Sequence, residues 1–242
     1  MADILTSLAV MNGRNLHARD GSILIVCTGN VCRSPYVERL LKARLAETNI
    51  NVMSAGTAAL TGSNMDPEIM QRLALTGADA GGFSATQLTE SLINEADLIL
   101  CVTRQHRSQV VQMTPRALRR TYALADFSDL ATPLVGIDLP NQDENAPFLR
   151  AVSAAAEQAR ASVQPRTRAQ TDIVDPFRQP KKFFEHMFAQ VDGLLPPIVA
   201  ALTGAPLEPI LVGERPHVGE PWMPRWSSSP GTPGRKDTPD AR

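Results

Sequence analysis

The feature that most constrains the fold is an apolar run that leads into a short loop beginning at a cysteine and ending at an arginine. Residues Ile23–Val26 are isoleucine, leucine and valine, and they run directly into Cys27-Thr-Gly-Asn-Val-Cys-Arg33-Ser34, with Pro35 next. Short apolar runs of this kind are typical of buried parallel strands, and proline is well tolerated in the first turn of a helix. The segment therefore predicts a strand, a tight loop and the start of a helix.

A loop of this kind is suited to hold an anion. Its successive backbone N–H groups point into one small concavity at the positive end of a helix, where a tetrahedral dianion fits. Gly29 permits a close backbone approach or a positive φ, Asn30 tolerates a left-handed conformation, and Arg33 can add a bidentate guanidinium. We expect the phosphate-binding residues to be Thr28, Gly29, Asn30, Val31, Cys32, Arg33 and Ser34.

Cys27, at the expected end of the strand, is the candidate nucleophile. A thiol at the mouth of an electropositive loop is expected to be ionised at neutral pH, and the Ser34 hydroxyl can donate a hydrogen bond to the thiolate. A single cysteine is more often a small buried hydrophobe. The pattern Cys-x-Gly-Asn-x-Cys-Arg-Ser between an apolar strand and a helix that starts at proline favours the catalytic interpretation.

Further along the chain, apolar runs alternate with helical patterns. Strands are expected at 22–26, 51–54, 97–102 and 121–124, and helices from Pro35, from Asp66-Pro67 with Asp66 as N-cap, and at 104–112, 148–163 and 183–195. Such alternation indicates a parallel sheet. We predict an α/β fold with a central four-stranded parallel sheet flanked by helices, a Rossmann-like three-layer sandwich.

Composition excludes several classes of function. A net charge of -1 over 242 residues argues against a general nucleic-acid binder, and three cysteines suggest reduced thiols in a cytoplasm rather than a disulfide scaffold. The first twenty residues lack the apolar core of a secretory signal, and no apolar run is long enough to span a bilayer. No metal-ligand spacing links the four histidines, His17, His106, His186 and His217. We expect a cytoplasmic protein that needs no metal or cofactor, binds no nucleic acid and does not insert into membranes; its oligomeric state stays open.

The segment 26–35 resembles the active-site loop of the low-molecular-weight protein-tyrosine phosphatases. The resemblance extends over about 22–130 and 172–200, and it includes Ser54-Ala-Gly-Thr57 in the second strand, the later core strand at 97–102, and Asp175-Pro-Phe-Arg178, which is similar to the family's general-acid motif. It implies hydrolysis of phosphotyrosine in a protein substrate through a phosphocysteine intermediate. Cys27 would be the nucleophile, Arg33 would bind the phosphate, and Asp175 would be the general acid and then the base, while Asn30 and Ser34 would order the loop and tune the thiolate.

Two assignments near the acid stay open. Asp172 lies three residues before Asp175 and competes with it for the role of acid, and either aspartate could instead be an ordinary turn or cap residue. Phe177 takes a place that often holds tyrosine in the family. It could form an aromatic wall against a phenyl phosphate or simply pack in the core.

The expected domain limits are an N-terminal extension over 1–20, a phosphatase domain over 21–203 and a Pro-rich, disordered tail over 204–242. The domain includes an insertion at about 132–171, which could be a lid, a partner surface or inert. Family members often have His and Arg near 83–87, where this chain has Phe83 and Thr86, so we expect the hydrogen bonds that support the loop to be built differently. A basic flank could bind acidic phosphopeptides or simply be solvated charge; it comprises Arg150, Arg160, Arg166, Arg168, Arg178, Lys181 and Lys182.

Other functions share this loop. Thioredoxin-coupled arsenate reductases need a relay of further cysteines, and only Cys101 lies outside the loop, in an apolar strand. Protein-arginine phosphatases tend to carry Thr where this chain has Val31, and an aliphatic residue there favours an aryl phosphate. A non-catalytic phospho-binding protein would not need both Cys27 and Asp175. Cys32 could form a reversible disulfide that protects Cys27 from oxidation, or could simply pack.

Overall fold

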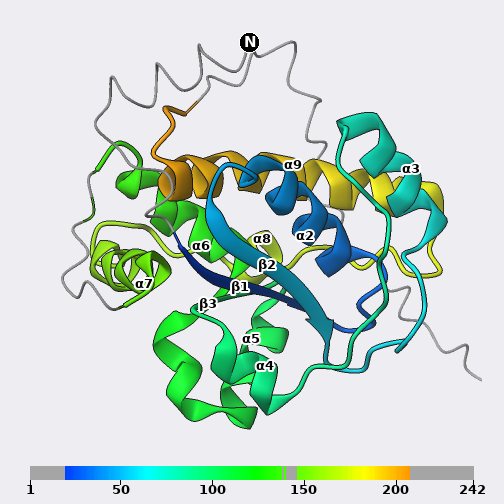
Figure 1. Ribbon diagram of the computed structural model, residues 1–242, viewed down its shortest axis with the longest axis horizontal. Coiled ribbons are helices and arrows are strands. Elements are labelled where there is room, and N and C mark those ends of the chain that lie inside the picture. The colour runs from blue at the N-terminus through cyan, green and yellow to red at the C-terminus, as the bar shows by residue number, and fades with distance from the viewer. Residues whose placement is uncertain (1–19, 138, 140–145, 208–242) are drawn as a thin grey trace, which may run out of the picture. The chain divides into compact units, whose positions relative to one another are not determined.

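Four parallel strands form the centre of the fold. The computed structural model describes residues 20–137, 139 and 146–207, and Figure 1 shows how their elements are arranged. The strands are β1 (Asp20–Cys27), β2 (Asn49–Gly56), β3 (Leu98–Cys101) and β4 (Thr121–Ala123), in the order β2-β1-β3-β4. Each neighbouring pair is parallel. The predicted four-stranded parallel sheet is confirmed.

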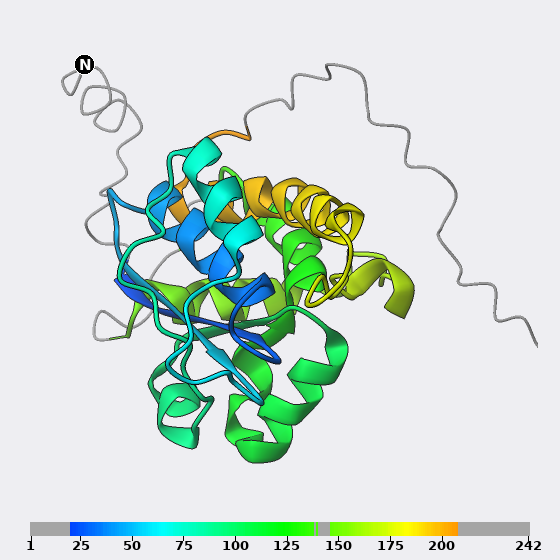
Figure 2. The ribbon, with the colours of Figure 1, turned by 90° about the vertical axis from the view of Figure 1, so that its right-hand side faces the viewer.

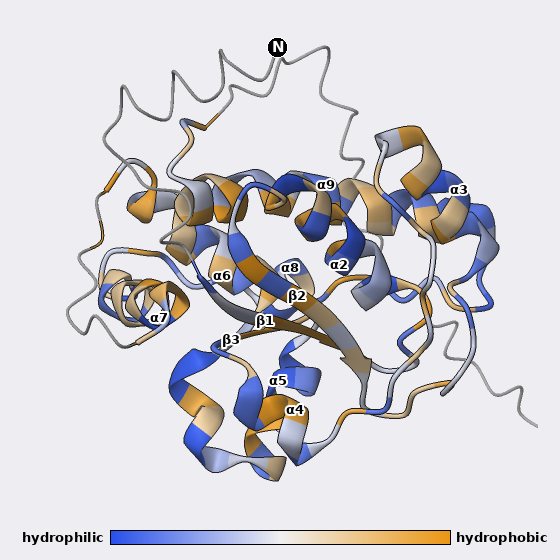
Figure 3. Cartoon of the chain, viewed as in Figure 1, coloured by the Kyte–Doolittle hydropathy of each residue, from blue (hydrophilic) through white to orange (hydrophobic). Residues whose placement is uncertain are grey.

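The side chains of β1 alternate between two separate cores. Ile23 and Ile25 point into the larger core, and Leu24 and Val26 into the smaller one. All four are fully buried, which explains why the strand is a continuous apolar run: a parallel sheet covered on both faces has no polar side. Part of β1 accordingly lies at the hydrophobic end of the colour scale in Figure 3.

Helices cover both faces of the sheet, as two perpendicular views show (Figures 1 and 2). The larger core is closed by α2 (Arg33–Arg44), α3 (Pro67–Thr76), α6 (Leu124–Ala131), α7 (Phe148–Ala159) and α9 (Lys181–Thr203). The smaller core is closed by α4 (Glu90–Glu95), α5 (Arg104–Met113) and the 3₁₀ helix η2 (Pro115–Arg120). The short helices η3 (Thr132–Leu134) and α8 (Arg168–Thr171) complete the described elements. The predicted three-layer arrangement is confirmed.

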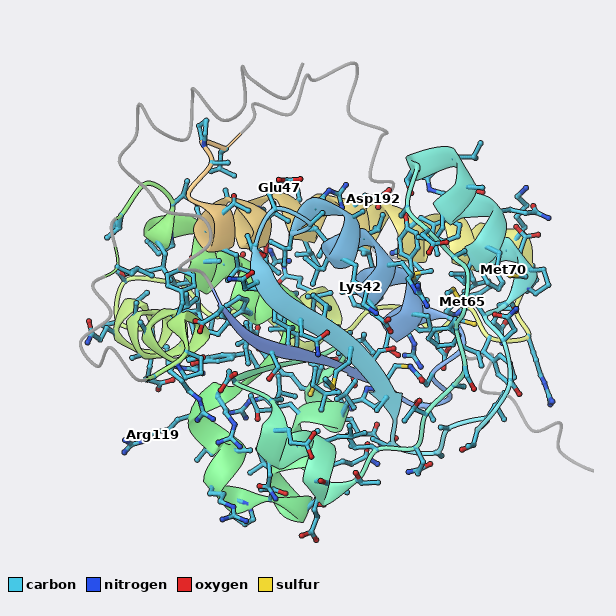
Figure 4. All side chains as sticks on the ribbon, in the orientation of Figure 1. Lys42, Glu47, Met65, Met70, Arg119 and Asp192 are labelled. Carbon is cyan, nitrogen blue, oxygen red and sulfur yellow. The ribbon has the colours of Figure 1, made fainter. Side chains whose placement is uncertain are left out.

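Asp192 of α9 ties three helices together, and its position is labelled in Figure 4. Its carboxylate accepts hydrogen bonds from Tyr36 Oη on α2 at 2.8 Å and from Arg72 Nη2 on α3 at 2.8 Å. The Arg72 guanidinium also lies over the ring of Phe188. This polar cluster holds α2 against α9, and α2 carries the end of the cysteine loop.

Several predicted boundaries were wrong. The fourth strand ends at Ala123, and Leu124 opens α6, whose buried Phe127, Leu130 and Ala131 follow at helical spacing. β2 runs from Asn49 through Gly56 rather than over 51–54. The helix predicted at 148–163 ends at Ala159, and α4 was not predicted at all. The Asp66 cap is confirmed, since its Oδ1 accepts from Glu68 N at 3.0 Å.

Helix α9 continues past the predicted end at 195, although Pro196 and Pro197 lie inside it. A proline in a helix interior costs about 3 kcal/mol. Burial opposes that cost, because Leu195, Ile198 and Leu202 are fully buried in the larger core and each contributes about 1.5–3 kcal/mol. Packing therefore outweighs the proline signal that made the sequence prediction stop early.

The insertion at 132–171 contributes directly to the core. Phe148, Leu149, Val152 and Ala156 of α7 are buried in the larger core. The other predicted parts fall mostly outside the described residues: of the extension over 1–20 only Asp20 is described, as the first residue of β1, and of the tail only 204–207. None of the described helices combines the length and the apolar character that crossing a membrane requires.

Candidate active site

The cysteine loop connects β1 to α2 at the carboxyl edge of the sheet. Cys27 is the last residue of β1 and Arg33 the first of α2, as the sequence predicts. Asn30 adopts a φ of 54°, the left-handed conformation expected for it. Ligands of open parallel sheets bind at this edge, so the loop lies where a substrate site belongs.

The Cys27 thiol is held by two contacts within the loop. Its Sγ is 2.9 Å from Ser34 Oγ, and the Asn30 backbone N–H donates to it at 3.2 Å. The residue is only 2% exposed. Two hydrogen-bonding groups of the loop therefore contact the sulfur.

The Asn30 side chain holds the loop in shape. Its Nδ2 donates to Ser34 Oγ at 2.9 Å and to Ser54 Oγ at 2.8 Å, and its Oδ1 accepts from Thr86 N at 2.7 Å. The loop is therefore supported at 86 by a backbone N–H rather than by a side chain, which is how this chain does without the expected histidine and arginine.

A buried carboxylate extends this support, and the sequence analysis missed it. Ser54 Oγ donates to Glu38 Oε2 at 2.5 Å, and Lys42 Nζ donates to Glu38 Oε1 at 2.7 Å. Glu38 is 4% exposed although it lies on α2 among apolar neighbours. A glutamate on the buried face of a predicted helix was the available signal.

The glycine that allows a close backbone approach to the loop is Gly56, not Gly29 as expected from the sequence. A Cβ on Gly56 would overlap the carbonyl oxygen of Thr28 and lie 3.0 Å from Asn30 N. A Cβ on Gly29 would meet only Val31 at 3.6 Å and Leu60 at 4.0 Å, and Gly29 is not among the described residues with positive φ. Gly56, at the end of the neighbouring strand, is what lets the loop sit against β2.

A small pocket of about 130 Å³ opens beside the thiol. Its polar floor includes Cys27 and Arg33, and the remaining lining residues are Thr28, Gly29, Val31, Cys32, Ala58, Leu60, Asp175 and Phe177. The volume is below that of pockets for drug-sized ligands, which begin at about 300 Å³. This lining suits a small anionic group, which the apolar side chains of the pocket would surround.

Asp175 reaches the pocket from a distant part of the chain. Its Oδ2 lies 2.6 Å from Arg33 Nη2, and its side chain is half exposed while that of Arg33 is buried. The segment before it is anchored by Ile173 N, which donates to Val102 O at 2.9 Å. Asp175 Oδ1 also accepts from Phe177 N at 3.2 Å, so the Asp-Pro turn aims the carboxylate at the arginine.

Asp172 is occupied elsewhere. Its Oδ1 accepts from Arg104 N at 2.8 Å, at the start of α5, and its Oδ2 from Arg168 Nε at 3.3 Å. It does not line the pocket. Of the two candidate acids, only Asp175 lies beside the thiol and the arginine.

This arrangement of thiol, anion loop and carboxylate has counterparts in known proteins. A family model described as "Low molecular weight phosphotyrosine protein phosphatase" matches residues 22–164, more than half of the chain. The chain belongs to this family. The matched range contains Cys27 and Arg33 but ends before Asp175.

Individual proteins are similar to this phosphatase over most of their length. This chain is 34% identical over 142 residues to "Probable low molecular weight protein-tyrosine-phosphatase EpsP" of Ralstonia solanacearum. The matched residues cover 58% of this chain and 97% of the relative. The structure of Wzb of Vibrio vulnificus in complex with benzylphosphonate is 27% identical with a TM-score of 0.53, covering 74% of this chain and 97% of that one. The YwlE arginine phosphatase of Geobacillus stearothermophilus is 25% identical with a TM-score of 0.53, covering 74% and 90%. The predicted class, a cysteine-dependent protein-tyrosine phosphatase, is confirmed by the family.

His106 contacts the cysteine loop of this phosphatase, a position that the sequence analysis did not predict. Its Nε2 lies 2.9 Å from Thr28 Oγ1 in the cysteine loop. It is 6% exposed, and burial, together with the nearby Arg33, lowers its pKa to about 4. A lone histidine shortly after the β3 strand carries no spacing signal, so only the fold identifies it.

The other two cysteines are buried free thiols. Burial raises the pKa of Cys32 and of Cys101 above the ordinary range. Cys101 is fully enclosed in β3, as expected. A protective disulfide between Cys32 and Cys27 stays a prediction; peroxide treatment followed by thiol mapping would contradict it if only over-oxidised Cys27 were found.

The basic flank divides into two groups. Arg150, Arg160, Arg166 and Arg168 form ion pairs with Asp97, Glu157, Asp129 and Asp172, at distances from 2.6 to 3.3 Å. No ion pair is seen among the described residues for the other three, Arg178, Lys181 and Lys182, which are exposed and follow Asp175 and Phe177 directly. In this second group, Arg178 lies over the ring of Phe177, which lines the pocket.

Proposed function

We propose that this phosphatase hydrolyses phosphotyrosine in a protein substrate, with Cys27 as nucleophile, Arg33 as phosphate ligand and Asp175 as general acid and base. The observation that carries the proposal is the Arg33–Asp175 contact of 2.6 Å in the same pocket as the Cys27 thiol. The phosphate-binding residues we propose are those of the loop, Thr28 to Ser34, because backbone N–H groups of such loops bind anions.

In the first step, the Cys27 thiolate attacks phosphorus and the bond between phosphorus and the tyrosyl oxygen breaks. Asp175, as the carboxylic acid, gives its proton to that oxygen, and phosphocysteine remains. The phosphoryl oxygens take the place of the Asp175 carboxylate on Arg33 and on the loop. The planar guanidinium can bind two of them at once.

In the second step, Asp175, now the carboxylate, accepts a proton from water as the water oxygen attacks phosphorus. The S–P bond breaks, inorganic phosphate leaves, and the Cys27 thiolate is restored. The Ser34 hydroxyl, 2.9 Å from the sulfur, stabilises the leaving thiolate. Neither step requires a metal or an external cofactor.

The apolar side chains that line the pocket favour an aromatic substrate. Leu60, Ala58 and Val31 line it together with Phe177, and Leu60 is 43% exposed. Phenyl rings bury favourably against such side chains. The solved Wzb of Vibrio vulnificus holds benzylphosphonate, an aryl ligand, and Val31 replaces the threonine expected of an arginine phosphatase.

The reaction also bears on compartment and domain limits. We propose a reducing compartment such as the cytoplasm, since a thiolate nucleophile must stay reduced. We also propose residues 21–203 as the catalytic domain, because α7 and α9 share the larger core with β1. Arsenate reduction is less well supported, as Cys101 is enclosed in β3 rather than available for a relay.

The test compares p-nitrophenyl phosphate hydrolysis by the wild-type protein and by Cys27→Ser and Asp175→Asn. We expect no turnover by Cys27→Ser and a loss of about 10²-fold or more in kcat for Asp175→Asn. Turnover that survives Cys27→Ser would refute the proposal. Capture of tyrosine-phosphorylated proteins by Cys27→Ser would then identify the protein substrate, and arsenate with thioredoxin would test the rival reaction.

A further inference from the structure

A chain of hydrogen bonds runs from the start of α5 into the cysteine loop. His106 Nδ1 lies 2.6 Å from Thr103 Oγ1, and His106 Nε2 lies 2.9 Å from Thr28 Oγ1. The same Thr28 oxygen accepts a hydrogen bond from Arg33 Nη2 at 3.4 Å. The proposed mechanism uses only the backbone of Thr28, so these side-chain hydrogen bonds have no role in it.

His106 stays neutral in this position. The charged groups that face it are Arg33 from α2, and Asp175 and Asp172 from the segment after α8; burial and Arg33 disfavour the imidazolium, and the two aspartates only partly oppose them. The arginines next to it on α5 turn elsewhere, since Arg104 pairs with Asp126 and Arg107 Nε donates to Thr121 O. A neutral imidazole has one N–H donor and one acceptor nitrogen.

The partners of Thr103 decide which nitrogen carries the proton. Thr103 Oγ1 accepts from the His106 backbone N–H at 3.2 Å. The Thr103 side chain is buried, and among the described residues His106 Nδ1 is the only acceptor that its hydroxyl contacts. A buried hydroxyl proton left without an acceptor is costly. The hydroxyl therefore donates to Nδ1, and the imidazole proton lies on Nε2.

With the proton on Nε2, His106 donates to Thr28 Oγ1. The Thr28 oxygen then accepts two hydrogen bonds, one from His106 and one from Arg33, and these occupy both of its lone pairs. Its own proton has no partner within this network. Thr28 lines the pocket, so that proton is available to a group bound there.

We infer that the Thr28 hydroxyl donates a hydrogen bond to a phosphoryl oxygen of the substrate, and that His106 is the positioning residue that orients this hydroxyl. The inference rests on the proposed function, because it assigns a further donor in the same phosphoryl site. No proton is transferred: Thr28 stays a hydroxyl and His106 stays neutral. Thr28 stabilises negative charge that builds up on the phosphoryl group, in the way an oxyanion donor does.

The experiment compares Thr28→Val, which removes the hydroxyl at nearly constant shape, with Thr28→Ser, which retains it. On p-nitrophenyl phosphate we expect Thr28→Val to lower kcat/KM about tenfold, below the 10²–10³-fold of a buried oxyanion donor because Thr28 is exposed. Thr28→Ser should stay within about threefold of wild type. Wild-type kcat/KM for Thr28→Val would overturn the inference.

His106 is tested by two substitutions and a double mutant. His106→Gln can place an amide N–H near the position of Nε2 and should retain most of the activity, whereas His106→Leu should lose about as much as Thr28→Val. Adding His106→Leu to Thr28→Val should cause little further loss, because both remove the same donor. Full additivity of the two losses would refute the positioning role of His106. His186→Leu, an exposed histidine of α9, is the control for loss of an imidazole.

A second measurement separates this role from a merely structural one. Vanadate, which mimics the pentacoordinate transition state, should bind Thr28→Val more weakly by the same factor as kcat/KM falls, while the thermal midpoint is unchanged. Equal vanadate affinity in wild type and Thr28→Val would contradict a hydrogen bond from the Thr28 hydroxyl to the phosphoryl group. If Cys27→Ser remained active, the proposed function would fail instead, so the two failures are distinguishable.

Discussion

Arg33 Nη2 and Asp175 Oδ2 lie 2.6 Å apart although 142 residues separate them in the chain. The contact joins the arginine that we propose as the phosphate ligand to the carboxylate that we propose as the acid. A phosphoryl group entering the pocket must displace the carboxylate from the guanidinium. Under the proposed mechanism, this displacement leaves the Asp175 carboxyl beside the leaving oxygen.

Replacing Asp175 by Asn should affect activity far more than stability. The Asp175 side chain is half exposed, so the ion pair contributes no more than about 1 kcal/mol to the free energy of unfolding. Asp172→Asn is the matched control: an asparagine can still accept from Arg104 N, and kcat should stay near wild type. Urea unfolding and steady-state kinetics measure both effects. A larger loss of kcat in Asp172→Asn would reverse the assignment of the acid.

Replacing Ser54 by Ala should weaken both the fold and the active site. It removes the acceptor for Asn30 Nδ2 and the donor to the buried Glu38 carboxylate. Loss of one partner from buried polar groups costs about 1–3 kcal/mol, and a displaced loop can lower kcat/KM by up to about 10²-fold. Ser108→Ala, whose exposed hydroxyl donates to Arg104 O, should change the free energy of unfolding by less than about 0.5 kcal/mol. Equal effects of the two substitutions would contradict the supporting role of Ser54.

Gly56→Ala should disrupt the loop, whereas Gly193→Ala should not. The new methyl at 56 would overlap the carbonyl oxygen of Thr28, so the backbone has to shift. A methyl at 193 in α9 meets nothing within 4 Å, and alanine is favoured over glycine in a helix by about 0.5–1 kcal/mol. We expect a lower thermal midpoint and severe loss of phosphatase activity for Gly56→Ala only. A fully active Gly56→Ala protein would show that the loop does not need this contact.

The three exposed cations that follow Asp175 in the chain, Arg178, Lys181 and Lys182, should favour acidic residues beside the phosphotyrosine. Glu185 one turn into α9 offsets only part of their charge. Lys181→Glu with Lys182→Glu should raise KM severalfold for a phosphotyrosine peptide with flanking aspartates, but not for p-nitrophenyl phosphate, and the effect should shrink in high salt. Arg116→Glu with Arg119→Glu makes the same charge change on η2, where Arg119 points away from the sheet (Figure 4). If both double variants raised KM equally, the effect would be one of net charge alone.

The depressed pKa of His106 predicts how stability depends on pH. Between about 6.5 and about 4, an unfolded chain binds a proton at His106 and the folded chain does not. The free energy of unfolding therefore falls as pH drops through this window, by up to about 3 kcal/mol, and this contribution is constant above it. His106→Gln should flatten the curve of urea stability against pH in that range. An unchanged slope in His106→Gln would show that other groups govern the acid side.

The parts of the fold that the sequence predicted are those with a local cause. The apolar run 23–26, the Asp66 cap and the spacing along α2 each act within a few residues. Helix α6 escaped prediction because its first residue follows a strand without a turn, and α9 passed its prolines because Leu195, Ile198 and Leu202 are buried against distant elements. Packing between residues far apart in the sequence determined the start of α6 and the length of α9, and no local sequence pattern predicts such packing.

The sequence by itself determined the chemistry of the loop, since Cys27 and Arg33 lie in one short segment whose spacing, glycine and proline all act locally. Only the tertiary structure placed Asp175 rather than Asp172 beside Arg33, joined Glu38 and Ser54 to Asn30, required glycine at 56, and brought His106 to Thr28. These residues meet because the carboxyl ends of parallel strands converge at one edge of the sheet. Distance along the chain carries no information about which side chains will share that edge.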